Sequence, residues 1–151
     1  MKQVYRVLAY VIAALVAVQA AAVAYGFFAL GKYIEAGNTV DQSTQTFPGD
    51  IGLMLHGIGG TIAIPAVALI LLILSFFAKI PGGVKWALIV FLTVVVQVAL
   101  GLFAHAVPLL GILHGLVALV LFGLAVTAAM RVGTATRAPE PSDRPSTPAR
   151  V

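Results

Sequence analysis

The 151-residue chain is 61% hydrophobic and 9% charged, with a formal net charge of +4. Soluble domains carry about 25% charged residues, so this composition excludes a solvated globular surface. The basic residues lie at the ends of apolar runs and lack interspersed aromatic residues, which favours membrane topology over a nucleic-acid interface. The chain has no cysteine, which excludes disulfides, thiolate metal sites, iron–sulfur clusters and thiol nucleophiles.

The first apolar run covers residues 4–30, behind Lys2 and Arg6. Val18-Gln19-Ala20 has the pattern of a signal-peptidase site. However, the hydrophobic part of a signal peptide is only about 7–15 residues long, whereas a membrane span needs about 20. The run therefore predicts an uncleaved transmembrane helix.

Three further apolar runs, each long enough to cross a bilayer, follow at residues 51–78, 86–107 and 109–130. The turn Phe47-Pro48-Gly49-Asp50 precedes the second run, and a basic turn at residues 79–85 separates the second from the third. Residues 132–151 are rich in Pro, Ser, Thr and Arg and predict a disordered tail. The sequence therefore predicts an all-α, integral membrane four-helix bundle over residues 1–131.

Charge predicts the orientation of this bundle. With the N terminus inside, the inner segments would hold eight of the nine basic residues, namely Lys2, Arg6, Lys79, Lys85, Arg131, Arg137, Arg144 and Arg150. The outer segments would hold only Lys32, together with Glu35, Asp41 and Asp50. This positive-inside bias predicts that both termini are cytoplasmic.

Small residues suggest how the helices pack. The first predicted helix carries a stripe of alanines at Ala13, Ala17, Ala20 and Ala24. The fourth has a small-xxx-small pair at Gly111 and Gly115. In lipid, close backbone approach at small residues favours helix association. We therefore expect a close contact at Gly115, whereas Leu121 is expected to face lipid.

Away from their ends, the four spans contain no Asp, Glu, Lys or Arg. This argues against a carboxylate-based ion transporter or an intramembrane protease. His56 and His114 each lie about six residues inside helices that enter from the same side, so both imidazoles are predicted roughly 9 Å below the outer surface. Gly60 follows His56, and Gly111 and Gly115 flank His114, which leaves room for a flat, bulky ligand.

Neutral imidazoles are common axial ligands of haem iron, and facing helices of a bundle can enclose the macrocycle. One alternative is that both histidines only bond neighbouring carbonyls. Another is a copper or zinc centre with His105 as a third ligand. His105 itself is predicted near the outer surface, as an interfacial residue or, with Lys32, as a partner of haem propionates. Gln19 and Gln97 are predicted near mid-bilayer in interhelical hydrogen bonds.

Three motifs lie between Leu55 and Met130: His56 at the outer start of one helix, Gln97-Val98-Ala99-Leu100-Gly101 in the next, and Leu113-His114-Gly115-Leu116-Val117-Ala118 at the start of the last. On these motifs the segment resembles one four-helix half of the haem A synthase family. The resemblance implies that His56 and His114 ligate a b-type haem. That family has a glutamate and an arginine where this chain has Leu53 and Gly57, so haem hydroxylation is not implied. The whole chain also resembles small membrane proteins of high-GC bacteria, which implies a bacterial plasma membrane.

Two functions follow from these observations. The first is a b-type haem protein for electron transfer or haem handling, not a stand-alone enzyme. Its expected cofactor-binding residues are His56, His105, His114, Gly60, Gly111 and Gly115. The second is a cofactor-free accessory or structural subunit of a larger membrane complex. Expected partners are the lipid bilayer and either a respiratory or other membrane complex or a second copy of the chain, with no nucleic acid.

Overall fold

The computed structural model describes residues 1–41, 43–44 and 46–134, and within these the chain forms helices and no strands. The elements, in chain order, are α1 (Lys2–Glu35), α2 (Asp50–Ile58), the π-helix η1 (Gly59–Ala63), α3 (Ile64–Ala78), α4 (Gly83–Ala104) and α5 (Leu110–Thr134). Four helical segments, with α2, η1 and α3 counted as one, are long and apolar enough to cross a membrane. The predicted all-α architecture with four membrane-length helices is confirmed. Of the predicted tail, residues 135–151 lie outside the described residues.

The second span contains an irregularity that follows from its sequence. Pro65 has no backbone N–H, and in an α-helix its ring would clash with the carbonyl four residues earlier. The chain forms a π-helical turn over Gly59–Ala63 at this point, in which the N–H of Ile64 donates to the carbonyl of Gly59. The turn is wider than an α-turn, and α3 continues directly from it. The second span is thus one continuous helix with a π-bulge just beyond His56.

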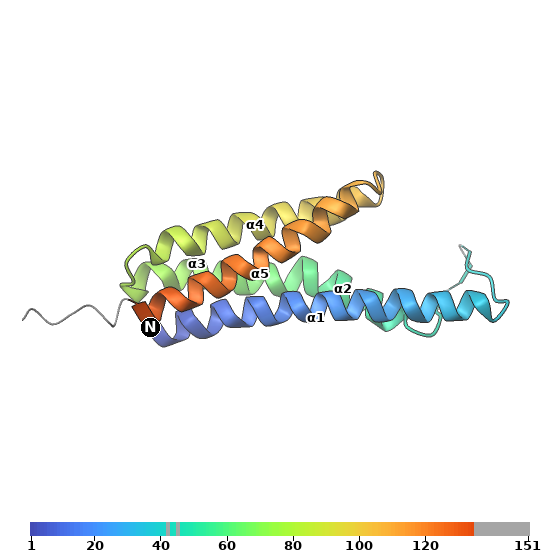
Figure 1. Cartoon of the computed structure of the whole chain (residues 1–151), viewed down its shortest axis with the longest axis horizontal. Helices are drawn as coiled ribbons and strands as arrows, with labels where there is room; N and C mark the ends of the chain where they lie inside the picture. The colour runs from blue at the N-terminus through green and yellow to red at the C-terminus, as the bar shows by residue number, and fades with distance from the viewer. Residues whose placement is uncertain (42, 45, 135–151) are drawn as a thin grey trace, which may run out of the picture.

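The helices form a bundle that is tightly packed in only one half. Figure 1 shows the N terminus, the α3–α4 turn and the end of α5 together at one end; we call this part the closed half. Its core consists of side chains that are at most 2% exposed, including Tyr5, Ala9, Ile12, Leu71, Val90, Ala125 and Ala128. The Tyr5 hydroxyl donates to the carbonyl of Gly83 at 3.0 Å, and the Arg131 guanidinium lies 4.6 Å from the centre of the Trp86 ring.

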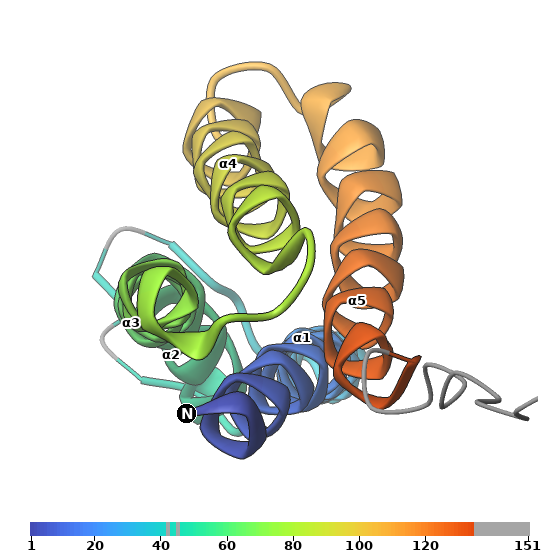
Figure 2. The same ribbon diagram turned by 90° about the vertical axis from the view of Figure 1, so that its left-hand side faces the viewer.

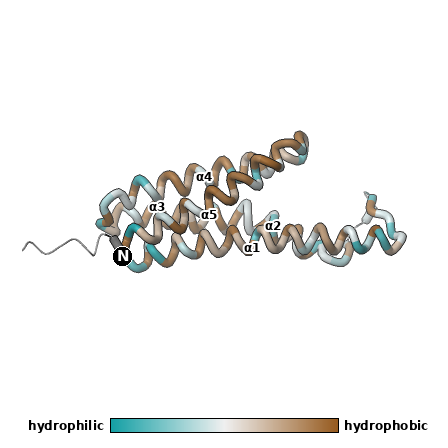
Figure 3. Tube along the Cα trace, viewed as in Figure 1, coloured by the Kyte–Doolittle hydropathy of each residue, from teal (hydrophilic) through white to brown (hydrophobic). Residues whose placement is uncertain are grey.

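Toward the opposite end, which we call the open half, the bundle divides into two helix pairs. Figure 1 and Figure 2 show α4 and α5 diverging together from α1. Within the described residues, α2 packs on α1, α4 packs on α5, and α2 has no substantial contact with either α4 or α5. Figure 3 shows hydrophobic residues along most of the four spans and hydrophilic ones gathered near the ends.

The close contacts between helices involve different glycines from those predicted. A Cβ added to Gly52 would lie 2.5 Å from the backbone oxygen of Ala22, and one added to Gly26 would lie 2.6 Å from Leu53 Cδ2. These glycines allow α1 and α2 to approach closely. The predicted contact at Gly115 is wrong, because an added Cβ there meets no atom within 4 Å.

Divergence of the helix pairs explains the other packing errors. Gly111 is also open, and of the predicted alanine stripe only Ala13 is buried, whereas Ala17, Ala20 and Ala24 are exposed. Leu121 was expected to face lipid but is 1% exposed, because it lies where α5 turns back into the closed half. The alanines predicted as a stripe beyond Ala13, together with Gly111 and Gly115, therefore do not bring helices together.

Candidate functional site

Each helix pair of the open half carries one glutamine and one histidine, joined by hydrogen bonds. In the first pair, Nδ1 of His56 on α2 lies 3.1 Å from the backbone oxygen of Gln19 on α1. The Gln19 side-chain amide returns a bond by donating to the backbone oxygen of Leu55 at 3.3 Å. Gly59 makes room for this amide, because a Cβ at that position would collide with it.

The second pair repeats this arrangement. Nδ1 of His114 on α5 lies 3.1 Å from the backbone oxygen of Gln97 on α4, and the Gln97 amide donates to the backbone oxygen of His114 at 2.9 Å. The His114 ring packs against Gly101, where an added Cβ would lie 3.0 Å from ring atom Cε1. The interhelical hydrogen bonds predicted for Gln19 and Gln97 are confirmed, but their pairing with the two histidines was missed.

These bonds fix the tautomer of both rings. A carbonyl oxygen can only accept, so Nδ1 of His56 and Nδ1 of His114 each carry a proton and donate it. In the neutral rings Nε2 then carries the lone pair and can accept a hydrogen bond or bind a metal. A backbone carbonyl on Nδ1 is the usual way in which proteins orient a histidine whose Nε2 binds a metal.

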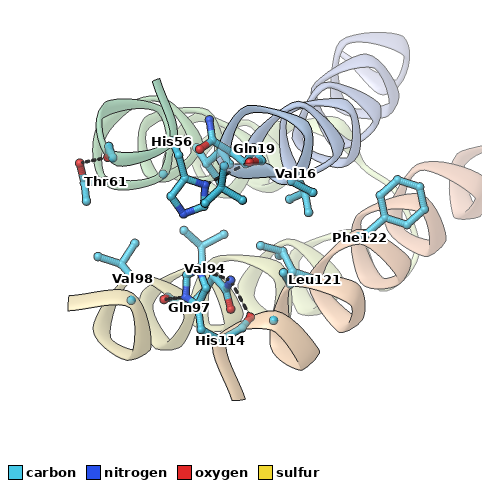
Figure 4. A pocket seen from close by; sticks show the side chains of 18 of the residues that line it. Val16, Gln19, His56, Thr61, Val94, Gln97, Val98, His114, Leu121 and Phe122 are labelled. Atoms are coloured by element: carbon cyan, nitrogen blue, oxygen red, sulfur yellow. Dashed lines mark hydrogen bonds between the residues drawn. The ribbon is translucent and has the colours of Figure 1, made fainter. Parts of the chain in front are cut away.

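The two histidines face each other across the gap between the helix pairs. Their ring centres are 5.9 Å apart and their planes are inclined by 71°. Figure 4 shows His56 pointing from the α1–α2 side and His114 pointing back from the α4–α5 side. The predicted matched depth of these two residues therefore corresponds to spatial contact.

A cavity of about 560 Å³ surrounds the two rings. All four spans contribute to its walls, which are apolar apart from His56, His105, His114, Gln19, Gln97 and Thr61. The floor toward the closed half is formed by aliphatic side chains such as Val16, Val94 and Leu121. The volume falls within the range of about 300–1,000 Å³ that is typical of small-molecule and cofactor sites.

Only some of the remaining predicted site residues line the cavity. Gly60, Gly115 and His105 line the cavity, whereas Gly111 does not. His105 is exposed, and its Nδ1 bonds the backbone oxygen of Gly101 at 3.1 Å. In the described part of the chain, no three His, Cys or acidic side chains are grouped to hold a metal ion, so His105 does not join the facing pair. Lys32, in the last turn of α1, is not among the lining residues.

Two polar atoms beside the cavity have no partner among the described residues. These are the side-chain oxygens of Gln19 and Gln97, which are buried there without a hydrogen-bond donor. The side-chain hydrogen bonds of both glutamines run through their amide nitrogens. The Gln97 nitrogen is shared, because it lies 3.3 Å from Nε2 of His114 in addition to its bond to the His114 backbone.

Comparison with protein families, with curated proteins and with solved structures finds no match to this chain. Two facing imidazoles, each with Nδ1 protonated and Nε2 as the acceptor atom, are groups that can ligate one metal ion. A flat, apolar metal chelate suits the cavity better than a hydrated ion, because the walls offer no charged side chain.

Proposed function

We propose that this chain is an integral membrane protein that binds a b-type haem, with His56 and His114 as its axial ligands. The observation that carries the proposal is the pair of imidazoles facing each other across an apolar cavity, each oriented by a backbone carbonyl. Haem would supply one-electron chemistry, so the protein would act in electron transfer or haem handling.

The spacing of the rings supports this proposal. Two imidazoles on opposite sides of one metal ion, each with a bond of about 2 Å, place their ring centres about 6 Å apart. The observed separation is 5.9 Å. The cavity that surrounds the rings is lined by Gly60 on η1 and Gly115 on α5, which have no side chain to fill the space that a macrocycle would need.

His105 fits a supporting role. It lies eight residues beyond Gln97 along α4, roughly 12 Å farther toward the open end, and it lines the cavity while remaining exposed. In this position it can pair with an anionic group at the edge of the ligand, such as a haem propionate. It would then influence the reduction potential without ligating the iron.

The charge distribution supports the location. Lys2, Arg6, Lys79, Lys85 and Arg131 lie at the closed end, so the positive-inside rule favours a cytoplasmic closed half and an open half at the outer face. The site would then lie in the outer leaflet of a bacterial plasma membrane, with both termini inside. A soluble electron acceptor added outside would reach the edge of the ligand.

The alternative is a cofactor-free accessory subunit whose histidines only pack the bundle. The Nδ1 bonds of both rings agree with such a role, since they satisfy each ring with a backbone carbonyl. A packing role does not require a cavity of about 560 Å³ around the rings, however. For this reason we favour ligand binding.

Haemin titration of the detergent-purified full chain tests the proposal. We expect a six-coordinate, low-spin spectrum with one haem per chain and sharp α and β bands after reduction. His56→Ala combined with His114→Ala should abolish this spectrum, whereas His105→Ala should retain it and at most shift the potential. A wild-type protein that acquires no Soret band, or equal loss in the His105 variant, would contradict the assignment.

A further inference from the structure

The two histidines are oriented alike, but their Nε2 atoms have different surroundings. Nε2 of His114 lies 3.3 Å from the amide nitrogen of Gln97. Since Nδ1 of this ring is the donor to a carbonyl, Nε2 is an acceptor and the Gln97 amide donates to it. No corresponding bond to Nε2 of His56 exists in the described residues, because the Gln19 amide donates to Leu55 instead.

The two Nε2 atoms differ because the side-chain amides of Gln19 and Gln97 donate to different backbone carbonyls. Gln19 donates to the residue before its histidine, which directs its nitrogen away from the ring. Gln97 donates to the backbone of the histidine itself, which leaves its nitrogen within reach of the ring. Within the described residues the Gln97 oxygen has no hydrogen-bond partner that would turn the amide away. Gln97 thus offers Nε2 of His114 a hydrogen-bond donor.

We infer that His114 is the exchangeable ligand of the pair and that a small neutral diatomic molecule binds haem iron in its place. This inference rests on the proposed haem ligation. Gln97 is a positioning residue, because it stabilises the His114 ring when that ring is not ligated. His56 has no such alternative partner and remains the permanent ligand.

A bond of this kind changes an equilibrium by a factor of about 2–10. Ligation through His114 Nε2 has to compete with the Gln97 amide, whereas ligation through His56 does not. Displacement of His114 is therefore easier than displacement of His56 by about this factor. The protein would act as a gas-responsive haem protein in addition to carrying electrons.

Carbon monoxide titration of the dithionite-reduced, haem-loaded full chain tests this inference, with the Soret shift as the signal. We expect wild-type protein to bind carbon monoxide. Gln97→Met, which keeps the length of the side chain but removes its donors, should raise the Kd for carbon monoxide about 2- to 10-fold. Thr93→Val is the matched control on α4, because its hydroxyl bonds only Ile89 and does not line the cavity; its Kd should not change.

A second comparison covers the case in which Gln97→Met does not fold. His114→Ala should retain five-coordinate haem that binds carbon monoxide more tightly than wild type, whereas His56→Ala should retain haem more weakly than His114→Ala. Haem binding without a carbon monoxide shift, an unchanged Kd in Gln97→Met, or equal haem retention in the two alanine variants would overturn the inference and leave haem binding intact. Absence of any haem spectrum would overturn both.

Discussion

Gly52 on α2 offers a quantitative test of the close approach of α1 and α2, the two helices that position His56. An added Cβ would lie 2.5 Å from the backbone oxygen of Ala22 and 2.9 Å from the backbone nitrogen of Gly26, whereas ordinary contacts begin near 3.4 Å. Both neighbours are main-chain atoms, so α1 and α2 would have to separate. Overpacking of this kind costs about 1–3 kcal/mol.

Gly57 on the same helix provides the control, since an added Cβ there meets nothing within 4 Å. Both Gly52→Ala and Gly57→Ala gain about 0.5–1 kcal/mol of helix propensity, so their difference isolates the steric cost. We expect Gly52→Ala to be the less stable by about 1–3 kcal/mol. Unfolding by SDS titration, followed by far-ultraviolet circular dichroism, measures this difference. Equal midpoints would refute the close approach of α1 and α2.

Three further predictions concern the rest of the bundle. Tyr5→Phe removes the buried bond to the carbonyl of Gly83 and should lower the free energy of unfolding by about 1 kcal/mol in the same assay; an unchanged midpoint would show that this bond contributes nothing. Leu121→Ala should lower the free energy of unfolding by about 2 kcal/mol or more, because it opens a void at a buried position. Leu119→Ala, at a 72% exposed position, should lower it much less. The reverse order would contradict the observed rotation of α5 about its axis. A reporter fused at the C terminus should be active only in the cytoplasm and one inserted near Thr44 only outside, and the opposite pattern would invert the proposed orientation.

The spans were predictable because the bilayer imposes a simple requirement on sequence. About 20 apolar residues without charge must be helical to satisfy their backbone groups in lipid. The ends were less predictable. α1 continues through Gly31 to Glu35, beyond its predicted end at residue 30, and ends just before Gly37, which has φ +84°. Pro65 signalled the π-bulge, but the run of apolar residues around it was interpreted as a regular helix.

The facing histidines were predictable from depth alone, and the same reasoning could have found their partners. Gln19 lies 13 residues beyond Arg6, which corresponds to roughly 20 Å from the inner face, and His56 was predicted roughly 9 Å below the outer face. In a hydrocarbon core of about 30 Å these two depths nearly coincide. What sequence could not supply was the rotation of each helix about its axis. For this reason Gly115, which is open, was selected instead of Gly101, which the His114 ring contacts.

The division of the bundle into a closed and an open half has a consequence for its dynamics. Segments with few buried contacts open locally at a lower free energy than a packed core does. Amide hydrogen exchange should therefore be fast around α2 and the start of α5 and slow around Leu71, Val90 and Ala125, which are fully buried. A ligand held by α2 and α5 together would add to the single ring contact between these helices, and its binding energy would appear as exchange protection confined to the open half. The site would thus act as the last element of the fold to form, completed only when the ligand is in place.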